Sequence, residues 1–502
     1  MSTPVSAASG QRAGGAIAWA VLVAAFGGFL FGFDIAVVNG AVNPLQEYFG
    51  LNEFWTGFVV ASGLLGCVVG AWFGGTVVDR LGRVRSMLVA AVLFLLSAVL
   101  SGLALTVYDF VLWRLLGGLG VGLASVIVPA YIAEIAPSRQ RGRLGSLWQL
   151  AIVIGIFASA VSNALVANLA GGAGAALWFG LESWRWMFMI EALPALIYGL
   201  LAITLPESPR YLVSRGRERE AKTVLHDVVG IQGEKALAEK VAEVRETINV
   251  EARQRLRDLL EGRRIKPIVW VGIGLAVFQQ VVGINVIFFY SNTLWQSVGI
   301  PEDQAFLVQV ITTSFNILAT IVGIMIVDRL GRRMPLAVGS LGMAVGLTVM
   351  CIAFTQAQVT TVPGGEDLVS LPDSWGIIAL VAANVFTFFF GVTWGPYMWL
   401  MLGEMFPNRI RAVALGVAAA FNWIANWAVS TFFPMMADVS LVFAYSLYAG
   451  CAYLSFLFVL KWVPETKGRE LEQMSENAHV SGVPKTDEGA EPRAEEASVG
   501  SR

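Results

Sequence analysis

The sequence contains twelve apolar runs, each long enough to cross a lipid bilayer as a helix. A membrane-spanning helix needs about 20 predominantly apolar residues. The runs cover residues 16–38, 55–78, 86–106, 109–133, 144–168, 186–205, 267–296, 304–327, 334–356, 376–403, 411–434 and 442–463. The composition agrees, because 56% of the 502 residues are hydrophobic and only 14% are charged. The chain is therefore predicted to be an all-α membrane protein.

Polar segments divide these runs into two groups of six. Residues 1–15 form a short polar N-terminus, and the run that follows is too long for the core of a signal peptide. Residues 16–205 and 267–464 each hold six runs. Between them, residues 206–266 are rich in Arg, Lys and Glu and carry apolar residues at helical spacing, which predicts amphipathic helices at the membrane surface. Residues 465–502 have little to bury and are predicted to be a disordered tail.

The positions of the basic residues predict the orientation of the chain in the membrane. One set of connections contains the arginine clusters at 80–85, 139–143, 329–333 and 409–411, together with the central polar segment. The connections on the opposite side of the membrane contain a single basic residue, Arg185. Lys and Arg are concentrated in cytoplasmic loops. Both termini are therefore expected in the cytoplasm, and the protein is expected to be a multi-pass protein of the cell (inner or plasma) membrane.

Three short motifs occur once in each half of the chain and in the same order. They are listed here as pairs: Asp79-Arg80-Leu81-Gly82-Arg83 with Asp328-Arg329-Leu330-Gly331-Arg332, Glu134 through Arg141 with Glu404 through Arg411, and Pro206-Glu207-Ser208 with Pro464-Glu465-Thr466. Parallel repeats of six spans, with a polar cavity between them near the middle of the membrane, are a transporter architecture.

These motifs resemble those of the sugar porters of the major facilitator superfamily, which include the bacterial xylose–proton symporter and the animal facilitative glucose carriers. Further matching motifs are Gln279-Gln280-x-x-Gly283-Ile284-Asn285, Gly395-Pro396-x-x-Trp399 and Pro464-Glu465-Thr466-Lys467-Gly468. The resemblance covers nearly all of residues 16–468. It implies twelve transmembrane helices in two pseudo-symmetric six-helix bundles, the major facilitator fold, with a cytoplasmic helical linker. Two positions depart from the family pattern: Val84 stands where a basic residue is usual, and Asp328 replaces the more frequent glutamate.

The resemblance implies a sugar-binding site between the two halves. A carboxamide can both donate to and accept from a sugar hydroxyl, and a tryptophan covers the apolar face of the ring. The implied sugar contacts are Gln149, Gln279, Gln280, Asn285, Asn316, Trp399, Asn422 and Trp423, with Tyr290 as a gate on the extracellular side. Gly283 is expected to let its helix bend. The alternative, that the amides only join helices together, accounts poorly for six amides within apolar spans.

Asp34 and Arg114 are the charged pair within the first six spans. Counted along the helices, both lie roughly 6–7 Å from the extracellular ends of their spans, so they can meet. An ionisable residue inside the membrane is a functional hypothesis by default. In the proton-coupled porters that the chain resembles, this aspartate takes up the proton, whereas the facilitative carriers have an asparagine there. The pair therefore favours proton coupling, tuned by Glu191 in the sixth span, and the alternative is a static salt bridge.

The repeated charged motifs predict a latch at the cytoplasmic ends of the spans. Opposite charges on neighbouring helices can pair there when the carrier faces outward. The latch residues are Asp79, Arg80, Arg83, Glu134, Arg141, Asp328, Arg329, Arg332, Glu404 and Arg411. The alternative for the arginines is membrane topology alone, which does not explain Glu134 and Glu404.

Several other functions are disfavoured by the sequence. The only histidines, His226 and His479, lie in polar regions, and the three cysteines lie inside apolar runs, so neither a metal site nor a cofactor is expected. No phosphate-binding loop or nucleophile–base arrangement occurs, which disfavours ATP-driven transport and an enzyme. The net charge of −2 gives no indication of nucleic-acid binding.

The predicted function is proton-coupled symport of a monosaccharide by alternating access, performed by a monomer. A facilitative uniporter is the main alternative, and a non-transporting sugar sensor is disfavoured because the tail after Pro464 is short. Glucose, xylose, galactose and inositol all stay open as substrates, with a hexose ahead. Asn422 resembles the residue of the glucose carriers, whereas Gly391 resembles that of the bacterial type.

Overall fold

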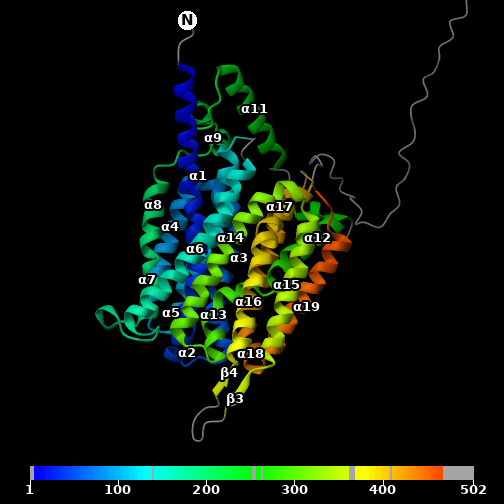
Figure 1. Cartoon of the computed structure of the whole chain (residues 1–502). Helices are drawn as coiled ribbons and strands as arrows, with labels where there is room; N and C mark the ends of the chain where they lie inside the picture. The colour runs from blue at the N-terminus through cyan, green and yellow to red at the C-terminus, as the bar shows by residue number, and fades with distance from the viewer. Residues whose placement is uncertain are drawn as a thin grey trace, which may run out of the picture.

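A computed structural model describes residues 5–137, 141–251, 256–261, 264–360, 368–407 and 410–466. Twelve of its helical segments are long and apolar enough to cross a membrane, and they stand side by side in one bundle (Figure 1). The prediction of an all-α protein with twelve spans is confirmed. The segment between the halves lies at the end of the bundle where α9 and α11 are labelled, and the β3–β4 hairpin lies at the other end.

The first half contains six spans, two of which are interrupted. Its elements are α1 (Val5–Val37), η1 (Val38–Ala41), α2 (Val42–Phe49), α3 (Glu53–Leu81), α4 (Arg83–Gly102), α5 (Val107–Ile135), α6 (Arg141–Ala170), η2 (Trp178–Gly180), α7 (Ser183–Ile190) and α8 (Ala192–Ala202). The first helix begins at Val5, before the apolar run, and passes through the 3₁₀ turn η1 into α2. The sixth span breaks at Glu191, between α7 and α8.

The second half repeats this plan with its own interruptions. Its elements are α12 (Pro267–Val281), α13 (Ile284–Ser297), α14 (Glu302–Leu330), α15 (Arg333–Phe354), β3 (Gln358–Thr360), β4 (Leu368–Ser370), α16 (Asp373–Phe389), the π-helical η4 (Phe390–Trp394), α17 (Gly395–Met405), α18 (Arg411–Val439) and α19 (Leu441–Trp462). The strands β3 and β4 pair antiparallel. A π-helical turn often marks a functional position within a span.

The seventh span breaks at Gly283, which separates α12 from α13. Gly283 has a φ of 86°, in the left-handed region that side-chain-bearing residues avoid. A Cβ atom at this position would lie 2.7 Å from Cδ2 of Tyr448. Both the backbone conformation and the surrounding space therefore require glycine at this bend.

Replacing Gly283 with alanine is expected to slow initial sugar uptake at least tenfold while sugar binding stays measurable. The left-handed conformation costs a side-chain-bearing residue about 1–2 kcal/mol, and the new methyl group would also push against Tyr448. The control is Gly416→Ala in α18, where a Cβ atom meets nothing within 4 Å. Uptake and binding by purified protein in proteoliposomes measure the effect. Wild-type transport by Gly283→Ala would show that the bend does not take part.

The segment between the halves folds into short helices with a small core of their own. It consists of α9 (Pro209–Ser214), α10 (Glu218–Asp227), α11 (Glu234–Glu251), η3 (Leu256–Leu259), β1 (Leu260–Glu261) and β2 (Arg264–Ile265), of which the two strands pair antiparallel. Leu212, Leu225, Leu237 and Val241 are buried against one another, apart from the main core. The apolar faces of these helices thus pack together, as amphipathic helices do.

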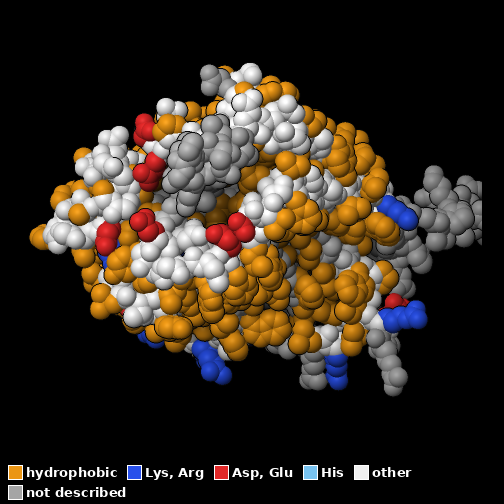
Figure 2. Space-filling model, turned by 90° about the horizontal axis from the view of Figure 1, so that it is seen from below, with side chains coloured by type: hydrophobic (Ala, Val, Ile, Leu, Met, Phe, Trp, Pro, Cys, Tyr) orange, Lys and Arg blue, Asp and Glu red, His pale blue; other side chains and the backbone are white. Residues whose placement is uncertain are grey.

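The two ends of the bundle differ in charge. We call the end that carries α9 to α11 the basic end, since the arginine clusters flank it. The opposite end, seen in Figure 2, displays acidic side chains among apolar ones, and we call it the acidic end. Glu47, Glu53, Glu182 and Glu302 belong to helix ends on that side.

Glycines bring several helices into backbone contact, which positions the site described below. A Cβ atom at Gly118 of α5 would lie 1.8 Å from the carbonyl oxygen of Gly63 in α3. Across the two halves, a Cβ atom at Gly57 of α3 would lie 1.9 Å from the carbonyl oxygen of Thr431 in α18. Small residues allow this close approach in membrane helices. The halves therefore meet backbone to backbone near the acidic end.

Candidate functional site

A buried ion pair joins α1 to α5 inside the first half. Nη1 of Arg114 lies 2.7 Å from Oδ1 of Asp34, and Nη2 donates to the carbonyl oxygen of Asp34 at 3.0 Å. Both side chains are almost fully buried. The guanidinium also faces the ring of Phe188, 5.3 Å from its centroid. The structure thus brings together the two charged residues that the sequence singled out, although 80 residues separate them in the chain.

Glu191 is the third ionisable member of this cluster. It lies at the break between α7 and α8, and it is fully buried. Its carboxyl group lies close enough to Asp34 and Arg114 to interact with both charges. The break between α7 and α8 therefore places a third ionisable side chain beside the ion pair.

A network of carboxamides occupies the inner side of the second half. Nε2 of Gln280 donates to Oε1 of Gln279 at 3.2 Å and to Oδ1 of Asn422 at 3.1 Å. Oε1 of Gln280 accepts from Nδ2 of Asn285 at 2.6 Å. Gln280 therefore lies at the centre of the network, in contact with the other three amides. The network joins α12, α13 and α18, on both sides of the bend at Gly283.

The backbone fixes the outer members of this network. Nε2 of Gln279 donates to the carbonyl oxygen of Trp394 at 3.1 Å, and Nδ2 of Asn422 donates to that of Ala276 at 2.8 Å. Asn422 also donates to Oε1 of Gln279 at 2.9 Å. Gln280 and Asn285 bond only to other amides among the contacts described. These two can exchange an amide partner for a hydroxyl group without disturbing the backbone.

Gln149 and Trp423 lie where the two halves face each other. Nε2 of Gln149, on α6, lies 3.9 Å from the position that a Cβ atom at Gly395 would occupy. The ring of Trp423 on α18 is in edge contact with Phe31 of α1 at 5.8 Å between centroids, and Phe31 lies at the same distance from Trp148. The sequence prediction did not include Phe31 and Trp148. The only signal for them is that Trp148 directly precedes Gln149 and that Phe31 lies three residues before Asp34.

Asn316, Trp399 and Tyr290 have different surroundings. Asn316 is buried on α14, and a Cβ atom at Gly391 would lie 2.7 Å from its Oδ1, so a side chain at 391 would displace it. Trp399 on α17 is 39% exposed and forms no described hydrogen bond with the amides. Tyr290 is buried, and its hydroxyl donates to the carbonyl oxygen of Ser430 at 2.7 Å. Tyr290 therefore ties α13 to α18 within the second half.

Amides that the sequence prediction did not include close the acidic end between the halves. Nδ2 of Asn39 on η1 donates to the carbonyl oxygen of Phe288 at 2.7 Å, and its Oδ1 accepts from the backbone N–H of Asn292 at 3.0 Å. Nδ2 of Asn43 donates to Oε1 of Gln296 at 3.2 Å, and its Oδ1 accepts from Thr293 Oγ1 at 2.8 Å, one turn further along α13. These bonds join the first and seventh spans.

A second contact across the acidic end comes from the loop between α6 and α7. The backbone N–H of Ala173 donates to Oε1 of Glu302, the first residue of α14, at 3.1 Å. Glu302 thus holds a loop of the first half against a helix of the second.

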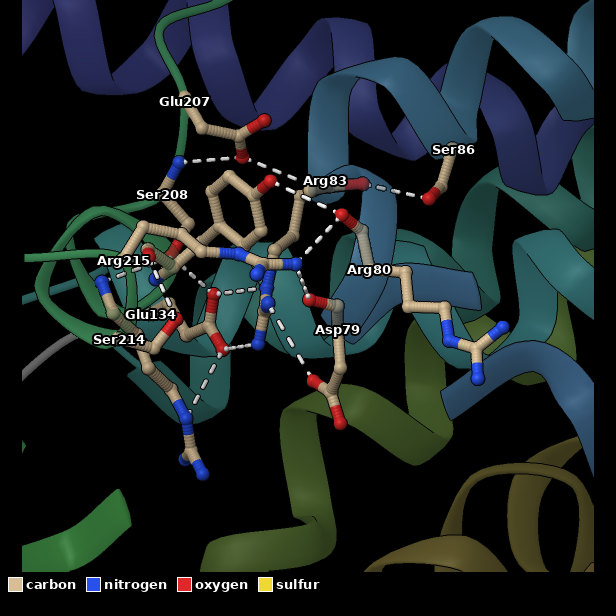
Figure 3. Close-up of polar contacts among 12 residues, drawn as sticks. Asp79, Arg80, Arg83, Ser86, Glu134, Glu207, Ser208, Ser214 and Arg215 are labelled. Carbon is tan, nitrogen blue, oxygen red and sulfur yellow. Dashed lines mark hydrogen bonds and ion pairs between the residues drawn. The ribbon is translucent and has the colours of Figure 1, made fainter. Parts of the chain in front are cut away.

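At the basic end, Arg83 and Glu134 form a two-bond ion pair (Figure 3). Nε and Nη2 of Arg83 lie 2.9 and 2.8 Å from the two carboxylate oxygens of Glu134. Ser208 Oγ also donates to Glu134. Glu207 accepts from the backbone N–H groups of Arg83 and Val84, at the start of α4. The segment between the halves is therefore bonded to the ends of α4 and α5.

The second half repeats this cluster with its own residues. Nε and Nη2 of Arg332 each lie 3.0 Å from an oxygen of Glu404. Thr466 Oγ1 donates to Glu404 at 2.6 Å, and Glu465 accepts from the backbone N–H groups of Arg332 and Arg333. The repeated sequence motifs are thus repeated structures. The pairs Arg83–Glu134 and Arg332–Glu404 each join two helices of the same half.

The remaining predicted latch residues contribute less to these clusters. Oδ1 of Asp79 lies 3.8 Å from Nη1 of Arg83, and the side chain of Asp79 is largely exposed. The side chain of Arg80 points away from the cluster in Figure 3, while its carbonyl oxygen accepts from Arg215. Arg411 donates to the carbonyl oxygen of Phe406. The side chains of Arg141, Asp328 and Arg329 lie outside the described residues. The latch between the halves stays a prediction.

Neutralising Glu134 by substitution with glutamine is expected to slow net uptake roughly fivefold. Glutamine keeps an acceptor oxygen but carries no charge, and a neutral hydrogen bond contributes about 1 kcal/mol less than a charge-assisted one. A loss of about 1 kcal/mol corresponds to roughly fivefold in rate. Glu404→Gln is expected to have the same effect, because its contacts repeat those of Glu134. Glu220→Gln is the control, since that residue pairs with Arg217 in an exposed position of the linker. Initial uptake rates measure the effect. Unchanged uptake by both variants would leave the arginines with a role in topology alone.

No group of three or more His, Cys, Asp and Glu in the described part of the chain is placed to hold a metal ion.

Comparisons with known proteins agree on a single kind of protein. Residues 20–478 match the family model described as Sugar (and other) transporter. A glucose transport protein of Synechocystis sp. is 50% identical over 455 residues, which cover 90% of this chain and 95% of that protein. A D-xylose-proton symporter of Escherichia coli is 37% identical over 487 residues, covering 90% and 94%. The Escherichia coli xylose transporter, in a partially occluded inward-open conformation, matches with a TM-score of 0.76 and 36% identity, over 90% of this chain and 99% of that one.

Proposed function

The chain belongs to the sugar transporter family, and from this we propose that it imports a monosaccharide together with a proton. The family assignment confirms the resemblance seen in the sequence and makes the protein a multi-pass membrane transporter rather than an enzyme. We further propose that it lies in the cell membrane with its basic end in the cytoplasm, as the distribution of Lys and Arg favours.

The observation that carries the proposal is the buried pair of Asp34 and Arg114. Removing two charges from water costs several kcal/mol, and a purely structural contact between helices needs no charges. Burial favours the protonated form of a carboxylic acid, and a neighbouring arginine favours the charged form. As the halves move, a change in the burial of the aspartate or in its distance from Arg114 would make it take up or release a proton. A relative of this chain is named a proton symporter, which supports the same mechanism.

Transport would proceed by alternating access. With the acidic end open, Asp34 carries a proton, is released from Arg114, and sugar binds between the halves. The halves then close at the acidic end and open at the basic end, where sugar and proton leave and the ion pair forms again. Two features of the present structure fit this last stage: the ion pair is formed, and Asn39 joins the halves at the acidic end.

The amide network is the proposed sugar site. Gln280 and Asn285 supply donors and acceptors that are not bonded to the backbone, and Gln149 of the other half lies near Gly395 of α17. Trp423 and Phe31 offer an aromatic surface for the apolar face of the sugar. We expect a hexose rather than a pentose as the preferred substrate, because the relative with 50% identity is named a glucose transport protein.

Uptake of labelled sugars by proteoliposomes tests substrate and coupling together. Glucose, xylose, galactose and inositol are each offered with and without an inward pH gradient. We expect glucose to accumulate above its external concentration only when the gradient is present, and a protonophore to abolish that accumulation. Equilibration to the external concentration in every condition would identify a facilitative uniporter instead. Uptake of none of the four sugars would overturn the substrate class.

A further inference from the structure

A small cavity of about 10 Å³ adjoins the Asp34–Arg114 pair. A water molecule needs at least about 10–15 Å³ of such space, so this cavity is at the lower limit for one molecule. Seven of its lining residues belong to α1, α3 and α5 of the first half, and Cys67 of α3 is one of them. The eighth is Phe289 of α13, which belongs to the second half. A side chain from the opposite half therefore forms part of the wall of the cavity beside Asp34.

Phe289 lies on the same helix as part of the proposed sugar site. It is 2% exposed, it follows Asn285 by four residues, and it directly precedes Tyr290. Four residues are about one helical turn. A movement of α13 that rearranges Asn285 must therefore also move the ring that lines the cavity beside Asp34. The bend at Gly283, where α13 begins, allows the helix to change its direction relative to α12.

Asn39 is bonded to the backbone of α13 on both sides of Phe289. In an α-helix such as α13, the N–H group of residue 292 faces the carbonyl oxygen of residue 288. The carboxamide of Asn39 hydrogen-bonds to both of these groups, at 2.7 Å from the oxygen of Phe288 and 3.0 Å from the nitrogen of Asn292. These two backbone positions lie on either side of Phe289. One side chain of the first half thus binds the stretch of α13 that carries the ring.

We propose that Phe289 is the lid of the Asp34 site, and that it admits water and protons from the acidic end only when α13 moves away from η1. With α13 bound to Asn39, the ring separates the carboxylate from that end. When α13 withdraws, water reaches Asp34, a proton moves from a hydronium ion to the carboxylate, and the bond to Arg114 breaks. This inference rests on the proposed proton coupling. It explains how a sugar site in one half can control a proton site in the other.

Among the described residues, the ionisable groups around Asp34 all belong to the first half. They are Arg114 of α5, Cys67 of α3, and Glu191 between α7 and α8. The residue that α13 adds to the cavity lining is an uncharged ring. Phe289 therefore acts on the proton by controlling access and not by its own charge, which makes it a positioning residue.

The native cysteine in the cavity makes the lid testable without reference to transport. Cys67 lines the same cavity, and Cys351→Ser with Cys451→Ser leaves it as the sole cysteine of the chain. In this background, Phe289→Ala is expected to raise the rate at which methyl methanethiosulfonate labels Cys67 at least tenfold. It is also expected to allow proton flux into sugar-free proteoliposomes under a pH gradient. Phe289→Tyr keeps a ring and should label at the rate of the parent.

Two further variants separate the lid from a general loosening of the helix. Phe288→Ala is the matched control, because that neighbouring ring does not line the cavity, and its labelling rate should equal that of the parent. Asn39→Ala keeps the ring but removes its attachment, so it should raise the labelling of Cys67 even if Phe289→Ala fails to fold. Sugar binding by each variant reports whether it is folded.

The outcomes distinguish the lid from proton coupling itself. Labelling of Cys67 at the parent rate in folded Phe289→Ala or Asn39→Ala would overturn the lid. Faster labelling without proton flux would overturn the role of the ring in proton access. Accumulation of sugar by Asp34→Asn would instead overturn the proposed coupling, and it would do so whatever the labelling of Cys67 shows.

Discussion

Replacing Asp34 with asparagine is expected to abolish accumulation of sugar against a gradient while leaving exchange of sugar across the membrane intact. Asparagine has nearly the shape of aspartate but does not bind a proton at any physiological pH. The halves could still move around a bound sugar, because the amide network is unchanged by this substitution. A pH gradient would no longer drive the cycle, so uptake would end at equal concentrations on both sides.

Two measurements on proteoliposomes check this result. Uphill uptake under an inward pH gradient should fall to the equilibration level, and counterflow of labelled sugar into sugar-loaded vesicles should stay within about a factor of three of wild type. Asp227→Asn is the matched control, because it makes the same change at an exposed aspartate of the linker. Uphill uptake by Asp34→Asn would show that the ion pair is only a link between helices. Loss of counterflow as well would indicate a misfolded variant, which a melting curve detects.

Replacing Gln280 with alanine is expected to weaken sugar binding about 100-fold, the second large effect. Gln280 contacts three other amides, so its removal takes away sugar-binding groups and also the described partners of Asn285 Nδ2 and Asn422 Oδ1. Two lost hydrogen bonds at about 1.4 kcal/mol each correspond to about 100-fold in Kd. The effect should appear in binding and in the KM for uptake, with little change in the coupling to protons.

Equilibrium binding of labelled sugar to purified protein measures this change. Gln356→Ala at the exposed end of α15 is the control, since it removes the same side chain away from the network. A Kd for Gln280→Ala within threefold of wild type would exclude the amide network as the sugar site. Asp34→Asn should bind sugar with near wild-type affinity, so the two substitutions are expected to separate sugar recognition from proton coupling.

The sequence indicated most of the residues that meet in the two clusters, but not how they meet. Asp34, Arg114 and Glu191 were selected because charges are rare within apolar runs, and the structure places them in one buried group. Gln279, Gln280 and Asn285 were selected by a motif, and the structure adds that Asn422 completes their network.

Other contacts carried no recognisable signal in the sequence. Asn39 and Asn43 are ordinary amides near the end of a span, and only the fold shows that they bond to α13. Phe289 and Phe31 are apolar residues in apolar runs, where any span has such rings. Trp399 was expected with the amides, yet it is partly exposed and forms no described hydrogen bond with them. In each case the sequence does not show which residues lie next to the side chain in the folded protein.

The sequence by itself determined the twelve spans and their two repeated groups, because each span must be apolar over a length set by the bilayer and must satisfy its own backbone hydrogen bonds. Those requirements are local and can be read from one segment at a time. The tertiary structure alone decided which polar groups are partners, since the bonds of Asn39 and Asn43 across the acidic end join residues about 250 positions apart. It also decided that Arg83 pairs with Glu134 and Arg332 with Glu404, each within its own half. Such partners depend on how helices pack, and packing is a property of the whole bundle.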